Sequence, residues 1–214
     1  SSGSAVSPSA SLKRRHMLLV GVTGGIGAGK STFAALLVER GAQVIDADQM
    51  GRAALDPGKP AWRAVVETFG DEVLAAASMN IDRKRLAQIV FNDPDKLAAL
   101  NAIVHPVILH AIADELDILR NTNEIVILDA ALLFELGLND SVDVVIVVVA
   151  DPKTREKRLV ERGMSLQDVH ARMEAQVDPS SVTERAQIVV RNDGTLEDLA
   201  AEADRVYGHL EALR

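Results

Sequence analysis

The stretch Gly21-Val-Thr-Gly-Gly-Ile-Gly-Ala-Gly-Lys-Ser31 decides the fold of this chain. Within it, residues 24–31 match the pattern G-x-x-x-x-G-K-[ST] at every required position. Glycines in such a loop let backbone N–H groups turn inward around phosphate oxygens without a Cβ clash. A glycine-rich turn that matches by chance is the alternative, but here the motif stands between a strand pattern and a helix pattern. The sequence therefore predicts a phosphate-binding loop.

The residues of this loop have separate expected roles toward a nucleoside triphosphate. Lys30 is expected to reach the β- and γ-phosphates, and the Ser31 hydroxyl is expected to bind Mg²⁺. The following helix points its N-terminus at the anion. The residues expected to contact the nucleotide are Gly25, Gly27, Ala28, Gly29, Lys30, Ser31 and Thr32.

Strand and helix patterns alternate on either side of the loop. Residues 18–23 form a short apolar run that is typical of a buried parallel strand. Residues 30–40 have the period of a helix, and residues 43–46 form a second short strand. Strand, loop, helix and strand make a βαβ unit, which predicts a parallel sheet with right-handed crossovers. Further strands are predicted at 125–129, 142–149 and 186–190, and further helices at 152–163 and 195–213.

Residues 60–119 differ from this alternation because they are almost entirely helical in pattern and contain no convincing strand. Pro106 interrupts the last helical period, which predicts a kink or a break near His105. The predicted fold is α/β: a parallel sheet flanked by helices, as in P-loop nucleotide kinases, with an α-helical substrate insert and a lid. The predicted parts are a core of residues 17–54 and 120–214, an insert of residues 55–119, and a lid of about 155–185. Residues 1–16 are predicted to be a disordered extension or an expression remnant.

Two acidic sites follow predicted strands. The carboxyl ends of the strands line the ligand crevice of an open α/β sheet, and Asp46-Ala47-Asp48 follows the second strand directly. Asp48 is the candidate base for an alcohol acceptor, and Asp46 is expected to assist with Mg²⁺ or with structure. Asp129 ends the third strand and is a candidate Mg²⁺ ligand. The alternative for each aspartate is a helix cap or turn.

A basic stretch follows the fourth predicted strand. Its members are Arg155, Lys157, Arg158 and Arg162, with Arg172 further along. The spacing places Arg155, Arg158 and Arg162 on one helical face, where guanidinium groups can bind phosphate oxygens. The alternative is a solvated helix with Glu156 and Glu161 as salt partners. We expect Arg158 and Arg162 to stabilise the transferring charge.

Composition limits the remaining possibilities. The formal net charge of −8 disfavours a general nucleic-acid binder. The absence of cysteine excludes disulfides and thiolate metal sites and fits a reducing cytosol. No stretch is expected to be long enough to span a bilayer. A cytoplasmic protein without a membrane or nucleic-acid partner is therefore expected.

Several further motifs carry a family resemblance. They are Asp46-Ala47-Asp48 with Arg52, LNAIVHP at 100–106, DAALLFELG at 129–137, Gln176, and the turn Asn192-Asp193-Gly194. Together with the phosphate loop, they make the chain, from Met17 to near its C-terminus, resemble the dephospho-CoA kinase family. Two positions depart from the family pattern: Ala131 stands where proline is usual, and Gly51 where alanine is common.

The resemblance implies a function. It implies transfer of the γ-phosphate of ATP to the 3′-hydroxyl of dephospho-CoA, with ATP and Mg²⁺ as cofactors. It implies that Asp48 is the base, that the insert, with Arg52 and His105, helps hold the acceptor, and that the nucleotide base lies near Asn192. His105 has a plain alternative as a hydrogen-bonded core residue. The oligomeric state is open, with a monomer favoured.

Two other functions compete with this one. The first is another P-loop kinase of a small metabolite or nucleotide, which would share the fold and differ in the acceptor. The second is a nucleotide-switch or regulatory binding protein. A GTPase would need an N-K-x-D element and an ABC-type ATPase would need L-S-G-G-Q, and the sequence offers neither.

Overall fold

The computed structural model describes residues 17–76, 78–91, 93–120, 122, 124–174, 176 and 179–214. The predicted N-terminal extension, residues 1–16, lies outside them. The strands are β1 (Leu18–Gly24), β2 (Gln43–Asp46), β3 (Ile125–Asp129), β4 (Val144–Val149) and β5 (Ile188–Arg191). The α-helices are α1 (Lys30–Glu39), α2 (Ala47–Ala54), α3 (Pro60–Phe69), α4 (Arg83–Phe91), α5 (Pro94–Leu119), α6 (Pro152–Glu161), α7 (Leu166–Glu174), α8 (Pro179–Thr183) and α9 (Leu196–Leu213). Two short 3₁₀ helices are η1 (Asp71–Val73) and η2 (Leu138–Asp140).

The five strands form one sheet in the order β2-β3-β1-β4-β5, and every neighbouring pair is parallel. The predicted α/β fold with a parallel sheet is confirmed. In the register of the sheet, Asp129 stands beside both Val22 of β1 and Asp46 of β2. Because all strands run the same way, the phosphate loop and both acidic sites lie together at the carboxyl ends of the strands.

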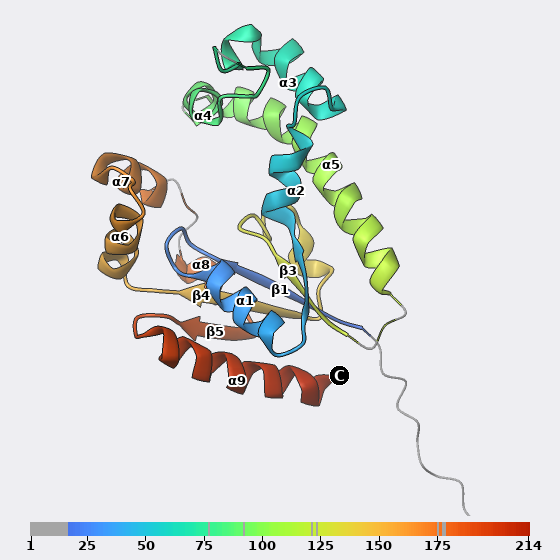
Figure 1. Cartoon of the computed structure of the whole chain (residues 1–214), viewed down its shortest axis with the longest axis vertical. Coiled ribbons are helices and arrows are strands. Elements are labelled where there is room, and N and C mark those ends of the chain that lie inside the picture. The colour runs from blue at the N-terminus through green and yellow to red at the C-terminus, as the bar shows by residue number, and fades with distance from the viewer. Residues whose placement is uncertain are drawn as a thin grey trace, which may run out of the picture.

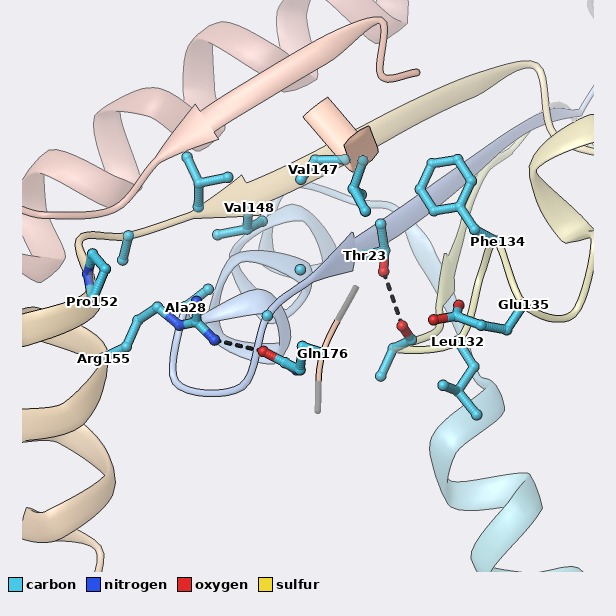
Figure 2. A pocket seen from close by; sticks show the side chains of 16 residues that line it. Thr23, Ala28, Leu132, Phe134, Glu135, Val147, Val148, Pro152, Arg155 and Gln176 are labelled. Carbon is cyan, nitrogen blue, oxygen red and sulfur yellow. Dashed lines mark hydrogen bonds between the residues drawn. The ribbon is translucent and has the colours of Figure 1, made fainter. Parts of the chain in front are cut away.

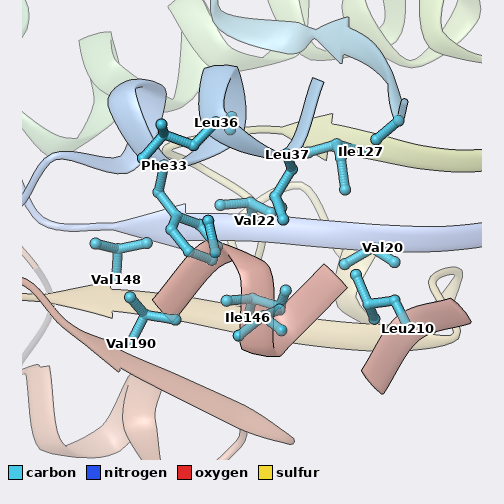
Figure 3. Close-up of a cluster of buried hydrophobic side chains, with 14 of the residues drawn as sticks. Val20, Val22, Phe33, Leu36, Leu37, Ile127, Ile146, Val148, Val190 and Leu210 are labelled. Carbon is cyan, nitrogen blue, oxygen red and sulfur yellow. The ribbon is translucent and has the colours of Figure 1, made fainter. Parts of the chain in front are cut away.

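Alternate residues of each strand point to opposite faces of the sheet. One set packs against α1 and α9, as Figure 3 shows for Phe33, Leu37 and Leu210. The opposite set, which includes Leu19, Val126 and Val145, packs against the second half of α5 and the segment after β3. The sheet is thereby covered on both faces, which explains why the three central strands β1, β3 and β4 are almost entirely apolar.

The segment between β2 and β3 is helical, as predicted, and stands above the sheet in Figure 1. It has a hydrophobic cluster of its own, formed by Trp62, Val65, Phe69, Val73, Ile81, Leu86 and Val90. Of the kink or break predicted near His105, the break is wrong, because α5 runs without interruption from Pro94 to Leu119, and the kink stays a prediction. Pro106 is exposed, so the carbonyl that loses its helical partner can bond to water.

The length of α5 contradicts a second expectation. Its 26 residues have the length and apolar composition of a membrane-crossing helix, which the sequence was not expected to contain. In the fold, Ile108 and Ile112 of this helix are buried against the sheet, and its first half contacts α3 and α4. Only 11% of its most apolar 18-residue window is buried, so these contacts use a part of its apolar surface.

Candidate active site

The phosphate loop joins β1 to α1 and has the backbone shape that its glycines allow. Gly27 and Gly29 have φ values of 78° and 95°, in the left-handed region that favours glycine. A Cβ on Gly24 would lie 2.5 Å from the backbone oxygen of Val148, so only glycine lets β1 approach β4 there. Lys30 is the first residue of α1 and is buried, whereas Ser31 is exposed at the same helix end.

The ammonium of Lys30 lies between two carboxylates. Its Nζ donates to Asp48 Oδ2 at 2.6 Å and lies 2.6 Å from Asp129 Oδ1. Burial by itself lowers the pKa of Lys30, but the charge and hydrogen bonding of Asp129 and Asp48 outweigh it and raise the pKa above its ordinary value of 10.5. The arrangement brings the predicted lysine, candidate base and candidate metal ligand together.

Asp129 is a buried carboxylate that already contacts a cation. The residue is only 4% exposed, and its Oδ1 forms an ion pair with Lys30 Nζ at 2.6 Å. Burial, offset by Lys30, raises the pKa of this carboxyl. The described residues contain no group of three or more His, Cys, Asp or Glu side chains that could hold a metal. A phosphate-loop Mg²⁺ needs only a Ser or Thr hydroxyl and an Asp, because phosphates and water supply its other ligands. Ser31 and Asp129 fit that requirement.

Asp48 and Asp46 have different partners. The second oxygen of Asp48, Oδ1, accepts a hydrogen bond from the Ala131 amide at 3.1 Å. Asp46 instead caps α2, because its side chain accepts from the Gln49 amide at 2.7 Å. Of the two aspartates, Asp46 is the one whose hydrogen bond caps a helix, while Asp48 points to Lys30.

The predicted arginines and Asn192 meet on the other side of the loop. Asn192 is buried; its Nδ2 donates to Ala28 O at 2.8 Å, and its Oδ1 accepts from Arg158 Nη2 at 3.3 Å. Arg158 Nη1 is buried and has no hydrogen-bond partner among the residues that the structure describes. These residues lie at a pocket of about 190 Å³ that Gly29, Thr32 and Arg162 also line.

A second and larger pocket, of about 350 Å³, lies beside the loop, and its lining side chains are drawn in Figure 2. Its walls are mostly apolar and include Phe134, Val147 and Val182, with Glu135 toward one end and Arg155 and Gln176 toward the other. The guanidinium of Arg185 lies 4.3 Å from the centroid of the Phe134 ring. The sequence did not identify this pocket, although Phe134 and Glu135 belong to a family motif.

Two predicted acceptor residues lie apart from the lysine and its acids. Arg52 is exposed and lies 3.8 Å from Asp46 Oδ2, rather than pairing with Asp48 or Asp129. His105 is half-buried on α5; burial lowers the pKa of its ring, while the charge of Glu135 acts in the opposite direction. His105 and Glu135 are thus close enough to interact electrostatically, but neither Arg52 nor His105 lines the two pockets described above.

Residues 18–198 match the protein family described as dephospho-CoA kinase. The chain belongs to the dephospho-CoA kinase family. A dephospho-CoA kinase from Streptomyces avermitilis is 49% identical over 195 residues, covering 91% of this chain and 94% of the relative. A dephospho-CoA kinase from Chlorobaculum tepidum is 40% identical over 203 residues, covering 93% and 98%.

Solved structures share the fold of this chain. TT1252 from Thermus thermophilus superposes with a TM-score of 0.78 at 35% identity, covering 91% of this chain and 98% of that one. A shikimate kinase from Bacteroides thetaiotaomicron has a TM-score of 0.56 at 15% identity, covering 91% and 99%, and shares the fold alone.

The side chains of Arg155 and Gln176 contact the tip of the phosphate loop, which is formed by residues 25–27. Arg155 is 7% exposed, and its Nε donates to Ile26 O at 2.8 Å. The sequence placed Arg155 on the same helical face as Arg158 and Arg162 but gave it no role of its own. The charge spacing was the available signal, but it could not distinguish the buried arginine from the exposed Arg162.

Proposed function

We propose that this chain transfers the γ-phosphate of ATP to the 3′-hydroxyl of dephospho-CoA, giving coenzyme A. The observation that carries the proposal is the contact of Lys30, in the phosphate loop, with Asp48 and Asp129, in a chain of the dephospho-CoA kinase family. An enzyme that transfers a phosphoryl group acts mainly by positioning and charge stabilisation. The loop and the two acids supply groups for both.

In this proposal Asp48 orients the acceptor hydroxyl and takes its proton. Its two oxygens are fixed by the Ala131 amide and by Lys30. When the triphosphate enters, Lys30 moves to the β- and γ-phosphates, and Asp48 Oδ2 becomes free for the hydroxyl. The proton passes to that oxygen as the ribose oxygen attacks the γ-phosphorus in line with the leaving ADP.

Mg²⁺ is proposed as the cofactor. Ser31 and Asp129 would hold it, and the buried, cation-contacting carboxylate of Asp129 at the end of β3 supports this choice. The ion, when bound, neutralises developing charge on the phosphates. Removal of Mg²⁺ with EDTA is expected to abolish transfer, and added Mg²⁺ is expected to restore it.

The smaller pocket is proposed to hold the base of ATP. It adjoins Gly29 and Thr32, so a nucleotide whose phosphates fill the loop would extend into it. Arg158 offers a flat guanidinium with one unpartnered N–H edge, and such planes stack on aromatic rings. Arg162 would lie over the phosphates when the segment of about 155–185 closes as a lid.

The larger pocket and the helical insert are proposed to hold the acceptor. The pocket borders the loop at Gly25 and reaches Glu135, which interacts electrostatically with His105 of α5. Its apolar walls and charged ends suit a molecule that joins a nucleoside, through a diphosphate, to a long arm with both methyl and amide groups. Residues 55–119 would form the acceptor insert, with Arg52 and His105 at its border. We further propose a cytoplasmic monomer with neither nucleic acid nor membrane as partner.

An acceptor screen tests the proposal. Purified protein is incubated with ATP and Mg²⁺ and either dephospho-CoA, a panel of nucleoside monophosphates, or shikimate, and products are measured by mass spectrometry. Phosphate added to dephospho-CoA alone supports the proposal. Transfer only to another acceptor would favour a different small-molecule kinase, and ATP hydrolysis without transfer would exclude both.

A further inference from the structure

Arg155 is a buried cation at the tip of the phosphate loop. It comes from the first turns of α6, and both of its contacts at the tip are to uncharged oxygens. Nε donates to the backbone oxygen of Ile26 at 2.8 Å, and Nη2 donates to Gln176 Oε1 at 2.5 Å. Within the part of the chain that the structure describes, no carboxylate forms an ion pair with it. Burial lowers the pKa of this guanidinium, but an arginine stays protonated in proteins.

Ile26 is held through both of its backbone polar groups. Its carbonyl accepts from Arg155, and its N–H donates to Gln176 Oε1 at 3.1 Å. The same oxygen of Gln176 accepts from Arg155, so the three residues form a closed ring of hydrogen bonds. Figure 2 shows the link between Arg155 and Gln176 beside Ala28.

The two glycines beside Ile26 fit closely against this ring. A Cβ on Gly25 would lie 2.7 Å from Arg155 Nη2 and 3.0 Å from Gln176 Oε1. A Cβ on Gly27 would lie 2.9 Å from the backbone oxygen of Arg155. The loop tip and its two partners are therefore in direct contact along three consecutive residues.

The ring also joins the loop to both ends of the α6–α7 segment. Arg155 lies in α6, and Gln176 follows the last residue of α7 by two positions. A hydrogen bond between Glu156 and His170, at 2.6 Å, links the same two helices. The conformation of Ile26 is thus tied to the position of the segment that carries the other arginines.

We propose that Arg155 and Gln176 are positioning residues that act through Ile26, holding the loop tip in the shape that receives the triphosphate. The inference rests on the proposed use of ATP, and it assigns to the ring a task in nucleotide binding rather than in the chemical step. A loop that is already ordered binds its ligand without a further ordering cost. Loss of the ring weakens ATP binding and leaves the transfer rate of the saturated enzyme little changed.

The test measures four variants: Arg155→Ala, Gln176→Ala, the double variant, and Arg155→Lys. Lys153→Ala is the matched control, because it removes an equal charge from the exposed start of the same helix. Each protein is titrated with a non-hydrolysable ATP analogue in the presence of Mg²⁺ by calorimetry, and its kcat and KM for ATP and dephospho-CoA are measured. Thermal melting confirms that each variant is folded, and Gln176→Ala retains the test if Arg155→Ala does not fold.

The expected result is a rise in the Kd of the analogue and in the KM for ATP of about tenfold in each single variant, as for a lost hydrogen bond to a charged group. The double variant is expected to be no weaker than the weaker single variant, because one ring is broken in all three. Arg155→Lys is expected to recover part of the affinity, and Lys153→Ala to match the unchanged protein.

An unchanged Kd in folded Gln176→Ala, or single effects that multiply in the double variant, would overturn the inference. A purely structural ring would lower the melting temperature and leave the Kd of the folded protein unchanged, which also overturns it. The calorimetry contains no acceptor, so a failure of the ring is distinguishable from a failure of the proposed acceptor. In the latter case the unchanged protein would bind the analogue but would not phosphorylate dephospho-CoA.

Discussion

The Nζ atom of Lys30 lies 2.6 Å from Asp48 Oδ2, so the invariant cation of the loop motif contacts the candidate base directly. A second carboxylate, Asp129, lies at the same distance. The position of this lysine therefore links the phosphate site, the proton acceptor and the candidate metal ligand, and the first prediction concerns its charge.

Lys30 is expected to stabilise the fold up to high pH. Because its pKa is raised in the folded protein, its contribution is fully present below 10.5 and is lost as the pH rises through the folded-state pKa. The difference in unfolding free energy between the unchanged protein and Lys30→Met should therefore stay constant to about pH 10 and shrink above it. Urea denaturation at a series of pH values measures this, with Lys153→Met as control. A difference that grows above that pH would contradict the assigned ion pairs.

Asp48→Asn is expected to lower kcat by about 10²- to 10⁴-fold, which is the usual contribution of a general base. The amide oxygen can still accept from Lys30 or Ala131, so the KM for ATP should change by less than about threefold. Asp46→Asn is the matched control, because asparagine also caps helices and should retain nearly full activity. Steady-state transfer to dephospho-CoA measures both. Equal losses in the two variants would remove the special role of Asp48.

Ala131→Pro tests the amide that holds Asp48. Proline lacks the N–H that donates to Asp48 Oδ1, while the contact with Lys30 remains. One exposed hydrogen bond contributes about 1 kcal/mol, so kcat should fall by roughly fivefold. Ala131→Gly retains the N–H and should retain the rate. A fall of more than about a hundredfold in the proline variant alone would mean that this amide is indispensable.

Asn192→Ala is expected to destabilise the protein by about 1–3 kcal/mol, because it leaves the Ala28 carbonyl and Arg158 without a buried partner. The KM for ATP should also rise, since both partners border the proposed base pocket. Urea denaturation and steady-state kinetics measure the two effects. Asn192→Asp keeps an acceptor for Arg158 and loses the donor to Ala28. Its loss of stability therefore measures the Ala28 contact, and the remaining difference from Asn192→Ala measures the Arg158 contact.

The core could be predicted from the sequence because its signals are local. Residues 24–31 have a backbone requirement that few sequences meet, and the strand that ends at Asp129 shows its β-branched run directly. Helix α2 was not predicted, because it has only eight residues and contains Gly51, which disfavours a helix. A Cβ there would lie 2.9 Å from Ile108 Cδ1, so this glycine reflects a close contact between α2 and α5 that no local pattern records.

The site could be predicted only in part, for the same reason. Asp129 ends β3, while Lys30 and Asp48 lie in the first turns of the helices that follow β1 and β2. The topology of a parallel sheet brings such positions together. The burial of Arg155 depends on packing between α6 and the loop, which are more than a hundred residues apart in sequence. The continuity of α5 through Pro106 depends likewise on its tertiary contacts, which outweigh the local cost of the proline.

The paired carboxylates around the Lys30 ammonium have a consequence for how ATP arrives. A triphosphate that draws the ammonium toward itself leaves two neighbouring negative charges facing its own negative oxygens. A ligand that brings a replacement positive charge reduces this repulsion. We therefore expect Mg²⁺-bound ATP to bind this loop more tightly than bare ATP.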